Sequence, residues 1–213
     1  NYTRESNPTR DGLEKTVSAL EGAVDTVACT SGMAAISLMM ELFDSSSHFV
    51  CTEDLYGGSV RIFEALEKKR GFSFSYINTA DVEAVEKALT DQTKALYIET
   101  PSNPTMQVTD LAEMSRLATK HGLLLIVDNT FLSPYLQNPI AQGAGEQRGG
   151  YRAVAVDDIK APLFERIHQL RRERQSRAVA HELRHVDARI AQHRKIEHGV
   201  IRVGIKRCHD RGI

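Results

Sequence analysis

An alternation of short apolar segments with amphipathic segments constrains the fold of this 213-residue chain more than any other feature. The apolar segments have the length and composition of strands, and each is followed by apolar residues at helical spacing. Strands that alternate with helices in this way favour an α/β fold, in which a mostly parallel sheet carries helices on both faces. We expect strands at 26–29, 48–52, 72–77, 94–99 and 123–127, and helices at 9–21, 31–43, 57–71, 81–89 and 110–122.

The strand at 123–127 runs directly into an acidic residue, Asp128. A bare carboxylate is costly at the end of a buried strand, so Asp128 needs a cationic or N–H partner. A protonated pyridine nitrogen, a metal ion or an arginine would serve, and a turn or N-cap aspartate is the alternative interpretation. Parallel sheets bind ligands at the carboxyl ends of their strands, which is where Asp128 is expected.

Three other strand ends carry residues that suit a ligand. Ser31–Gly32 opens a helix whose free N–H groups would suit a phosphate, or Ser31 is simply an N-cap. Tyr56, in "DLYGGS", would stack on a flat ring, or is an ordinary rim tyrosine. Asn103 lies between two prolines that would hold its amide rigidly, or is a turn asparagine.

Taken together, these motifs resemble the Cys/Met-metabolism enzymes that use pyridoxal 5′-phosphate (PLP), among them the cystathionine lyases, cystathionine γ-synthase and methionine γ-lyase. The resemblance runs from Tyr2 to about Ile140. It rests on five motifs in the family's order and spacing: "YTRESNPTRDGLEKTVSALEG", "SGMAAI", "DLYGGS", "IETPSNPT" and "VDNTFLSPYLQNPI". It implies that residues 1–140 are part of a PLP fold-type-I large domain.

The resemblance also implies roles for the candidate residues. Asp128 would pair with the N–H of the cofactor ring, and Tyr56 would stack on that ring and act as a catalytic residue that helps to move protons. The phosphate would be held at Ser31, Gly32 and Met33. Thr130 and Asn103 would lie near the ring oxygen and the substrate, and Arg61 near the substrate. Tyr2 and Arg4 would reach the phosphate of a neighbouring subunit in a homodimer or homotetramer.

The implied reaction is β- or γ-elimination or replacement at a sulfur-containing or homoserine-derived amino acid. It needs a lysine in an "S-x-T-K" stretch, about 25 residues after the ring aspartate, that forms a Schiff base with PLP. Ala153 stands at that position, inside "RGGYRAVAVDD", and the nearest lysine, Lys160, lacks the motif. The Schiff-base lysine is therefore not identified, and we expect negligible lyase activity from these 213 residues alone. A non-catalytic fragment is the alternative.

The composition changes near Ile140. Residues 1–140 hold 11 Lys/Arg against 19 Asp/Glu, whereas residues 141–213 hold 16 against 9 and six of the eight histidines. We therefore treat 141–213 as a divergent basic tail, helical over about 163–190 or poorly ordered. A frameshift, a truncation or a gene-model error would produce the same abrupt change.

The tail has two further interpretations. "HELRH" fits the H-E-x-x-H pattern of zinc hydrolases, with His181 and His185 as candidate ligands, but no third histidine follows at the metzincin spacing. A basic binding module is the other alternative. No aromatic platform or recognised motif supports nucleic-acid binding, so a solvated basic face is favoured.

Composition also excludes some classes of protein. No apolar stretch approaches the roughly 18 residues that span a membrane, so no membrane partner is expected. Three widely spaced cysteines do not make a disulfide framework, and Cys29 and Cys51 lie in strand-like segments as expected of buried thiols. We expect a cytoplasmic protein.

Overall fold

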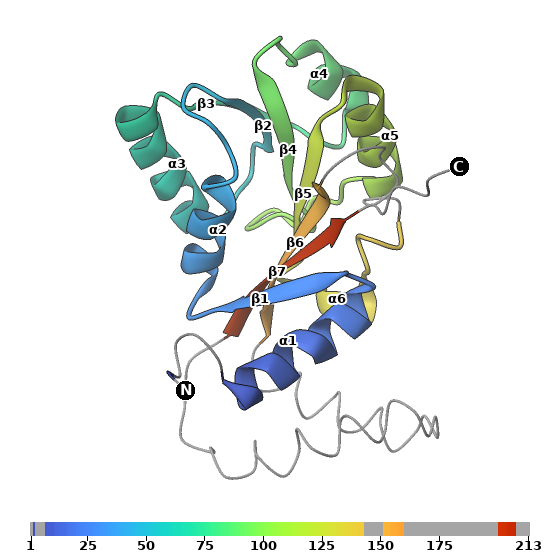
Figure 1. The fold of residues 1–213 in the computed structure, drawn as a ribbon. Helices are drawn as coiled ribbons and strands as arrows, with labels where there is room; N and C mark the ends of the chain where they lie inside the picture. The colour runs from blue at the N-terminus through green and yellow to red at the C-terminus, as the bar shows by residue number, and fades with distance from the viewer. Residues whose placement is uncertain (1, 3–6, 143–150, 160–199, 208–213) are drawn as a thin grey trace, which may run out of the picture.

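The computed structural model describes residues 2, 7–142, 151–159 and 200–207. Within them lies one seven-stranded sheet in the order β1-β7-β6-β5-β4-β2-β3, with helices on both faces (Figure 1). The strands are β1 (Asp25–Cys29), β2 (His48–Thr52), β3 (Ser73–Ile77), β4 (Thr93–Glu99), β5 (Leu124–Asp128), β6 (Tyr151–Ile159) and β7 (Val200–Arg207). The helices are α1 (Pro8–Glu21), α2 (Gly32–Met40), α3 (Gly57–Arg70), α4 (Val82–Lys87), α5 (Leu111–His121) and α6 (Ser133–Leu136).

The sheet is mostly parallel, as the sequence predicts. Strands β2, β3, β4, β5 and β6 pair in parallel, while β7 runs antiparallel to both of its neighbours, β6 and β1. Since β1 and β6 both run against β7, β1 has the same direction as the parallel strands. The carboxyl ends of β1, β2, β4 and β5 therefore meet at one edge of the sheet.

Two apolar layers cover the two faces of the sheet. Alternate residues of a strand point to opposite faces, so Phe49 and Tyr97 join one cluster with α2 and α3, whereas Val50 and Leu96 join another with α4 and α5. The first layer contains a run of aromatic rings, in which Phe63 stacks on Phe74 with ring centroids 4.5 Å apart. Both faces of the central strands are thus buried, which is why these strands read as continuous apolar runs.

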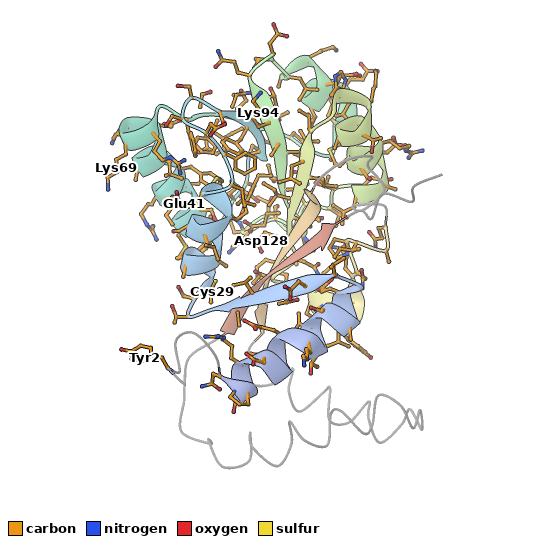
Figure 2. The ribbon with its side chains drawn as sticks, viewed as in Figure 1. Tyr2, Cys29, Glu41, Lys69, Lys94 and Asp128 are labelled. Atoms are coloured by element: carbon orange, nitrogen blue, oxygen red, sulfur yellow. The ribbon has the colours of Figure 1, made fainter. Side chains whose placement is uncertain are left out.

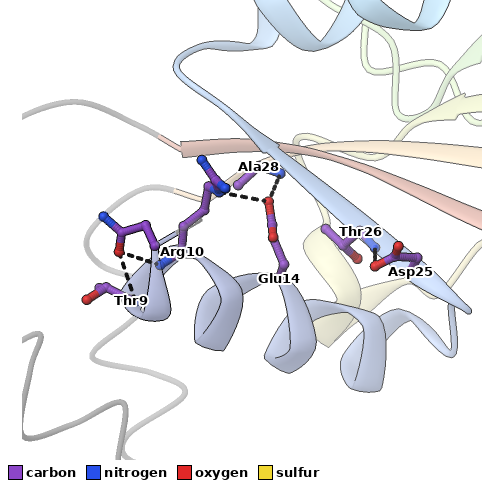
Figure 3. Close-up of polar contacts among 7 residues, drawn as sticks. Thr9, Arg10, Glu14, Asp25, Thr26 and Ala28 are labelled. Atoms are coloured by element: carbon purple, nitrogen blue, oxygen red, sulfur yellow. Dashed lines mark hydrogen bonds and ion pairs between the residues drawn. The ribbon is translucent and has the colours of Figure 1, made fainter. Parts of the chain in front are cut away.

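Local signals in the sequence fix the ends of the helices. The side chain of Asn7 caps α1 by accepting from the backbone N–H of Thr9, and α1 contacts β1 where Glu14 accepts from the N–H of Ala28 (Figure 3). Helices α1 and α3 end at Gly22 and Gly71, with φ values of 67° and 68°. Only glycine adopts this left-handed conformation without steric cost, so the helices stop there.

The structure differs from the prediction in two segments of the basic tail. Residues 151–159 and 200–207 are the strands β6 and β7, and neither is helical. Each finds its hydrogen-bonding partner on a distant segment, β5 for β6 and β1 for β7, and local spacing gives no sign of such pairing. The helices predicted within 163–190 lie outside the described residues. The division into 1–140 and 141–213 stays a prediction.

Of the two cysteines expected to be buried, the structure confirms Cys51 and places Cys29 closer to the surface. Cys51 is fully buried on β2, and Cys29 is half-buried at the end of β1. Burial raises the pKa of both thiols, and the charge of Glu14 raises that of Cys29 further. Among the described helices, none is both long enough and apolar enough to cross a membrane.

Candidate active site

Asp128 is the last residue of β5 and lies at the carboxyl edge of the sheet, 6% exposed (Figure 2). Two neighbours donate hydrogen bonds to its carboxylate. Thr130 donates to Oδ1 through its backbone N–H at 3.1 Å and through its hydroxyl at 2.6 Å. The hydroxyl of Tyr97 donates to Oδ2 at 3.3 Å. These contacts fix the plane of the carboxylate before any ligand arrives.

Tyr97 remains a hydrogen-bond donor at neutral pH because of where it lies. Its ring is fully buried on β4 and meets Phe63 edge-on, with ring centroids 5.1 Å apart. Burial raises the pKa of Tyr97 well above its usual value, and the charges of Asp128 and Glu99 raise it further. A tyrosine that keeps its proton can orient Asp128 without competing for a cation.

Glu99 lies beside Asp128 at the end of the neighbouring strand. The two residues are in register across β4 and β5, and Glu99 is also 6% exposed. Its Oε2 accepts a hydrogen bond from the backbone N–H of Tyr56 at 3.0 Å. Burial raises the pKa of Glu99 to about 8, and the neighbouring charge of Asp128 contributes in the same direction. Asp128 and Glu99 therefore form a pair of adjacent buried carboxyl groups.

The sequence analysis overlooked Glu99, although the signal was present. Glu99 ends the apolar run "KALYIE" in the same way that Asp128 ends "LLLIVD". The argument that singles out Asp128, the cost of a carboxylate at the end of a buried strand, applies equally to Glu99.

Tyr56 lies between the end of β2 and the start of α3, and its ring is 48% exposed. The ring packs closely over Gly58. A Cβ added to Gly58 would come within 2.3 Å of Tyr56 Cε1 and 2.8 Å of Met33 Sδ. The absence of a side chain at Gly58 therefore lets the Tyr56 ring, the start of α3 and Met33 at the start of α2 come together.

Ser31 and Gly32 begin α2, directly after β1. The Ser31 hydroxyl accepts from the N–H of Ala34 at 3.2 Å, so the N-cap interpretation of Ser31 is confirmed. Gly32 and Met33 are half-buried in the first turn. This turn is close to Tyr56 through the contact between Met33 and Gly58.

Asn103 is half-buried in the loop 100–109 that follows β4, and the bonds before Pro101 and Pro104 are cis. Asp54, in the loop that follows β2, holds the loop 100–109 in place. Its Oδ2 accepts from the Ser102 hydroxyl and the Thr105 N–H, both at 2.8 Å, and from the Thr105 hydroxyl. The hydroxyl and N–H of Thr105 lower the pKa of Asp54.

The remaining predicted site residues lie in different places. Tyr2 is 67% exposed, and Figure 2 shows it apart from Asp128. Arg61 is exposed in the second turn of α3, and its Nη1 reaches back to the start of that helix, 3.6 Å from where a Cβ added to Gly57 would lie. Arg4, Lys160, His181 and His185 lie outside the described residues, within which no group of three or more potential metal ligands occurs. Ala153, at the position expected for the lysine, lies within β6 in register with Leu125.

Comparison with known proteins places the chain in a family. Residues 1–145 match the model of the Cys/Met metabolism PLP-dependent enzymes. The chain is 48% identical over 143 residues to a cystathionine gamma-lyase of Bacillus subtilis, and 45% identical over 144 residues to a cystathionine gamma-synthase of Haemophilus influenzae. Each match covers 67% of this chain but only 38% and 39% of the relative, respectively. The matched part of the chain thus spans less than half the length of either curated relative.

The fold comparison extends beyond the matched sequence. The crystal structure of cystathionine gamma-lyase from Lactobacillus plantarum, complexed with L-serine, has a TM-score of 0.74 and 32% sequence identity. The match covers 97% of this chain and 45% of that one. Sequence and fold agree, and the chain belongs to the family of Cys/Met metabolism PLP-dependent enzymes.

Proposed function

We propose that the carboxyl edge of the sheet binds PLP, and that the protein carrying this chain uses it for β- or γ-elimination or replacement at a sulfur-containing or homoserine-derived amino acid. The observation that carries the proposal is the buried carboxylate of Asp128, held by Thr130 and Tyr97. When bound, PLP supplies a protonated pyridine ring that withdraws electrons from the carbon next to the amino group.

The residues at this edge fit the chemistry of that group. A buried carboxylate suits a protonated ring nitrogen, because the two charges compensate each other where water is scarce. The exposed ring of Tyr56 has a free face for stacking. The N–H groups at the start of α2, at Gly32 and Met33, would hold the phosphate.

The other proposed roles follow the family pattern. Thr130 and Asn103 would lie near the ring oxygen and the substrate, and Arg61 near the substrate. Tyr2 and Arg4 would serve the site of a neighbouring subunit, which implies a homo-oligomer. The exposure of Tyr2 in this single chain agrees with a role outside its own fold.

A PLP titration of the purified chain tests the proposal. We expect Asp128→Asn to weaken PLP binding about tenfold to a hundredfold, because a hydrogen bond to a charged group contributes about 1.5–3 kcal/mol. Asp91→Asn is the matched control, since Asp91 is exposed just before β4 and so lies at the opposite edge of the sheet. Equal PLP affinity of Asp128→Asn and wild type would refute the assignment.

A second measurement separates binding from catalysis. We propose that the chain alone has negligible lyase activity, because Ala153 stands where the family places its lysine. Borohydride reduction in the presence of PLP, followed by peptide mass mapping, shows whether any lysine carries the pyridoxyl group. Stoichiometric labelling of Lys160, with elimination activity that Lys160→Ala abolishes, would show that the tail completes the site.

A further inference from the structure

Two acidic side chains link two loops at the carboxyl edge through hydrogen bonds. One loop follows β2 and carries Asp54 and Tyr56, and the other follows β4 and carries Asn103. Glu99, at the end of β4, accepts from the N–H of Tyr56 on the first loop, while Asp54 on the first loop accepts from Thr105 on the second. Each candidate ligand-binding loop is thus anchored by a carboxyl group from the other strand end.

We infer that Glu99 is a positioning residue, whose carboxyl group holds the Tyr56 ring at the cofactor edge by accepting the backbone N–H of Tyr56. This inference rests on the proposed function. Two observations carry it. The backbone N–H of Tyr56 donates a hydrogen bond of 3.0 Å to Glu99, a residue that is only 6% exposed, and the Tyr56 ring and the Met33 sulfur both pack closely on Gly58. Glu99 thus fixes the backbone of Tyr56, and Gly58 provides the surface on which the Tyr56 ring rests.

The charges around Glu99 explain why it holds Tyr56 as a hydrogen-bond acceptor and does not need a negative charge to do so. Burial has the largest effect and raises the pKa of Glu99; the acidic Asp128 on β5 and Asp54 after β2 raise it further, whereas the N–H of Tyr56 lowers it. Among the described residues that act on the Glu99 carboxyl group, the N–H of Tyr56 is the one that favours ionisation. A carbonyl oxygen of a protonated carboxyl group accepts a hydrogen bond without adding a second negative charge beside Asp128.

Amide hydrogen exchange tests the hydrogen bond from the Tyr56 N–H to Glu99, which we call the anchor, and it needs no cofactor. We expect the Tyr56 amide of Glu99→Ala to exchange about tenfold faster than wild type, since a hydrogen bond of this kind is lost. Glu99→Gln keeps an acceptor oxygen and should remain within about threefold of wild type. Glu53→Ala, which removes an exposed carboxylate from the same loop, is the control and should change nothing. Unchanged exchange in Glu99→Ala overturns the inference.

PLP affinity then shows whether the anchor acts through Tyr56. Glu99→Ala should weaken PLP binding about tenfold and Glu99→Gln less than threefold. In a Tyr56→Ala background, Glu99→Ala should change the affinity by less than about twofold, because the ring that it positions is gone. A full tenfold loss in that background, or equal losses for Gln and Ala, overturns the inference. Absence of PLP binding in wild type would refute the proposed function. The exchange rate of the Tyr56 amide tests the hydrogen bond to Glu99 independently of that result.

Discussion

Gly58→Ala should weaken PLP binding while leaving the free energy of unfolding almost unchanged. The new Cβ would lie 2.3 Å from Tyr56 Cε1 and 2.8 Å from Met33 Sδ, so the Tyr56 ring must retreat by at least about 1 Å to reach an ordinary contact distance of about 3.5 Å. The ring is 48% exposed and can swing toward solvent. The Met33 sulfur also lies on a flexible side chain, so movements of these two side chains relieve the clash and the backbone of α3 need not move.

The expected magnitudes follow from these contacts. Alanine in place of glycine in a helix contributes up to about 1 kcal/mol, which offsets the lost packing, so we expect the free energy of unfolding to change by less than about 1 kcal/mol. An aromatic stacking contact contributes about 0.5–1.5 kcal/mol, so PLP affinity should fall by a factor of about 2 to 13. Urea unfolding and PLP titration measure the two quantities.

Gly57→Ala provides the matched control. Its Cβ would meet only Arg61 Nη1, at 3.6 Å, which is an ordinary contact. It receives the same change of residue type in the same helical turn, without displacing Tyr56. If Gly58→Ala binds PLP as tightly as Gly57→Ala does, the Tyr56 ring does not depend on Gly58 and the reasoning fails.

Three further outcomes are expected. Burial and Asp128 raise the pKa of Glu99 to about 8 in the folded chain. When the pH lies between the ordinary pKa of a glutamate and this raised value, Glu99 loses its proton in the unfolded chain but keeps it in the folded chain. Wild type should therefore lose stability relative to Glu99→Gln as the pH rises from about 5 to 8, by at most about 1.4 kcal/mol per pH unit in urea unfolding, and a constant difference would contradict the raised pKa. Asp54→Ala should speed exchange of the Thr105 amide several-fold, because that amide donates to Asp54 at 2.8 Å; unchanged exchange would show that Asp54 does not hold the loop. Asn7→Ala should lower the free energy of unfolding by about 1 kcal/mol through loss of the α1 cap, and thermal denaturation would show no shift if the cap does not form.

The elements before residue 129 could be predicted because their signals are local. Helix α1 has its apolar residues at helical spacing and ends at Gly22, and the apolar run before Asp128 has the length of one strand. Each signal lies within the element that it defines, so no knowledge of the partner strands is needed. Asp128 could be singled out for the same reason, because the cost of a buried carboxylate depends on its own strand.

The parts that could not be predicted depend on contacts between distant segments. Strand β7 pairs with β6 on one side and β1 on the other. The sequence around it is rich in arginine, so without knowledge of that pairing it reads as part of a basic tail. The link from Glu99 to Tyr56 joins residues 43 positions apart, and the packing of Met33 on Gly58 joins the starts of two helices. Such contacts arise from topology, and sequence spacing does not encode them.

The position of β1 at the edge of the sheet dictates an order of events during protein synthesis. Strand β1 pairs with β7, with Asp25 opposite Ile205, whereas β2, β3, β4 and β5 all lie between residues 48 and 128. On a ribosome, those four strands can pair with one another while the partner of β1 has not yet been translated. Strand β1 therefore docks later than β2 to β5, and α1 has to wait with it until the residues of β7 have been translated. Nascent chains arrested before residue 200 should therefore expose the segment 7–29 to protease while β2 to β5 are already protected.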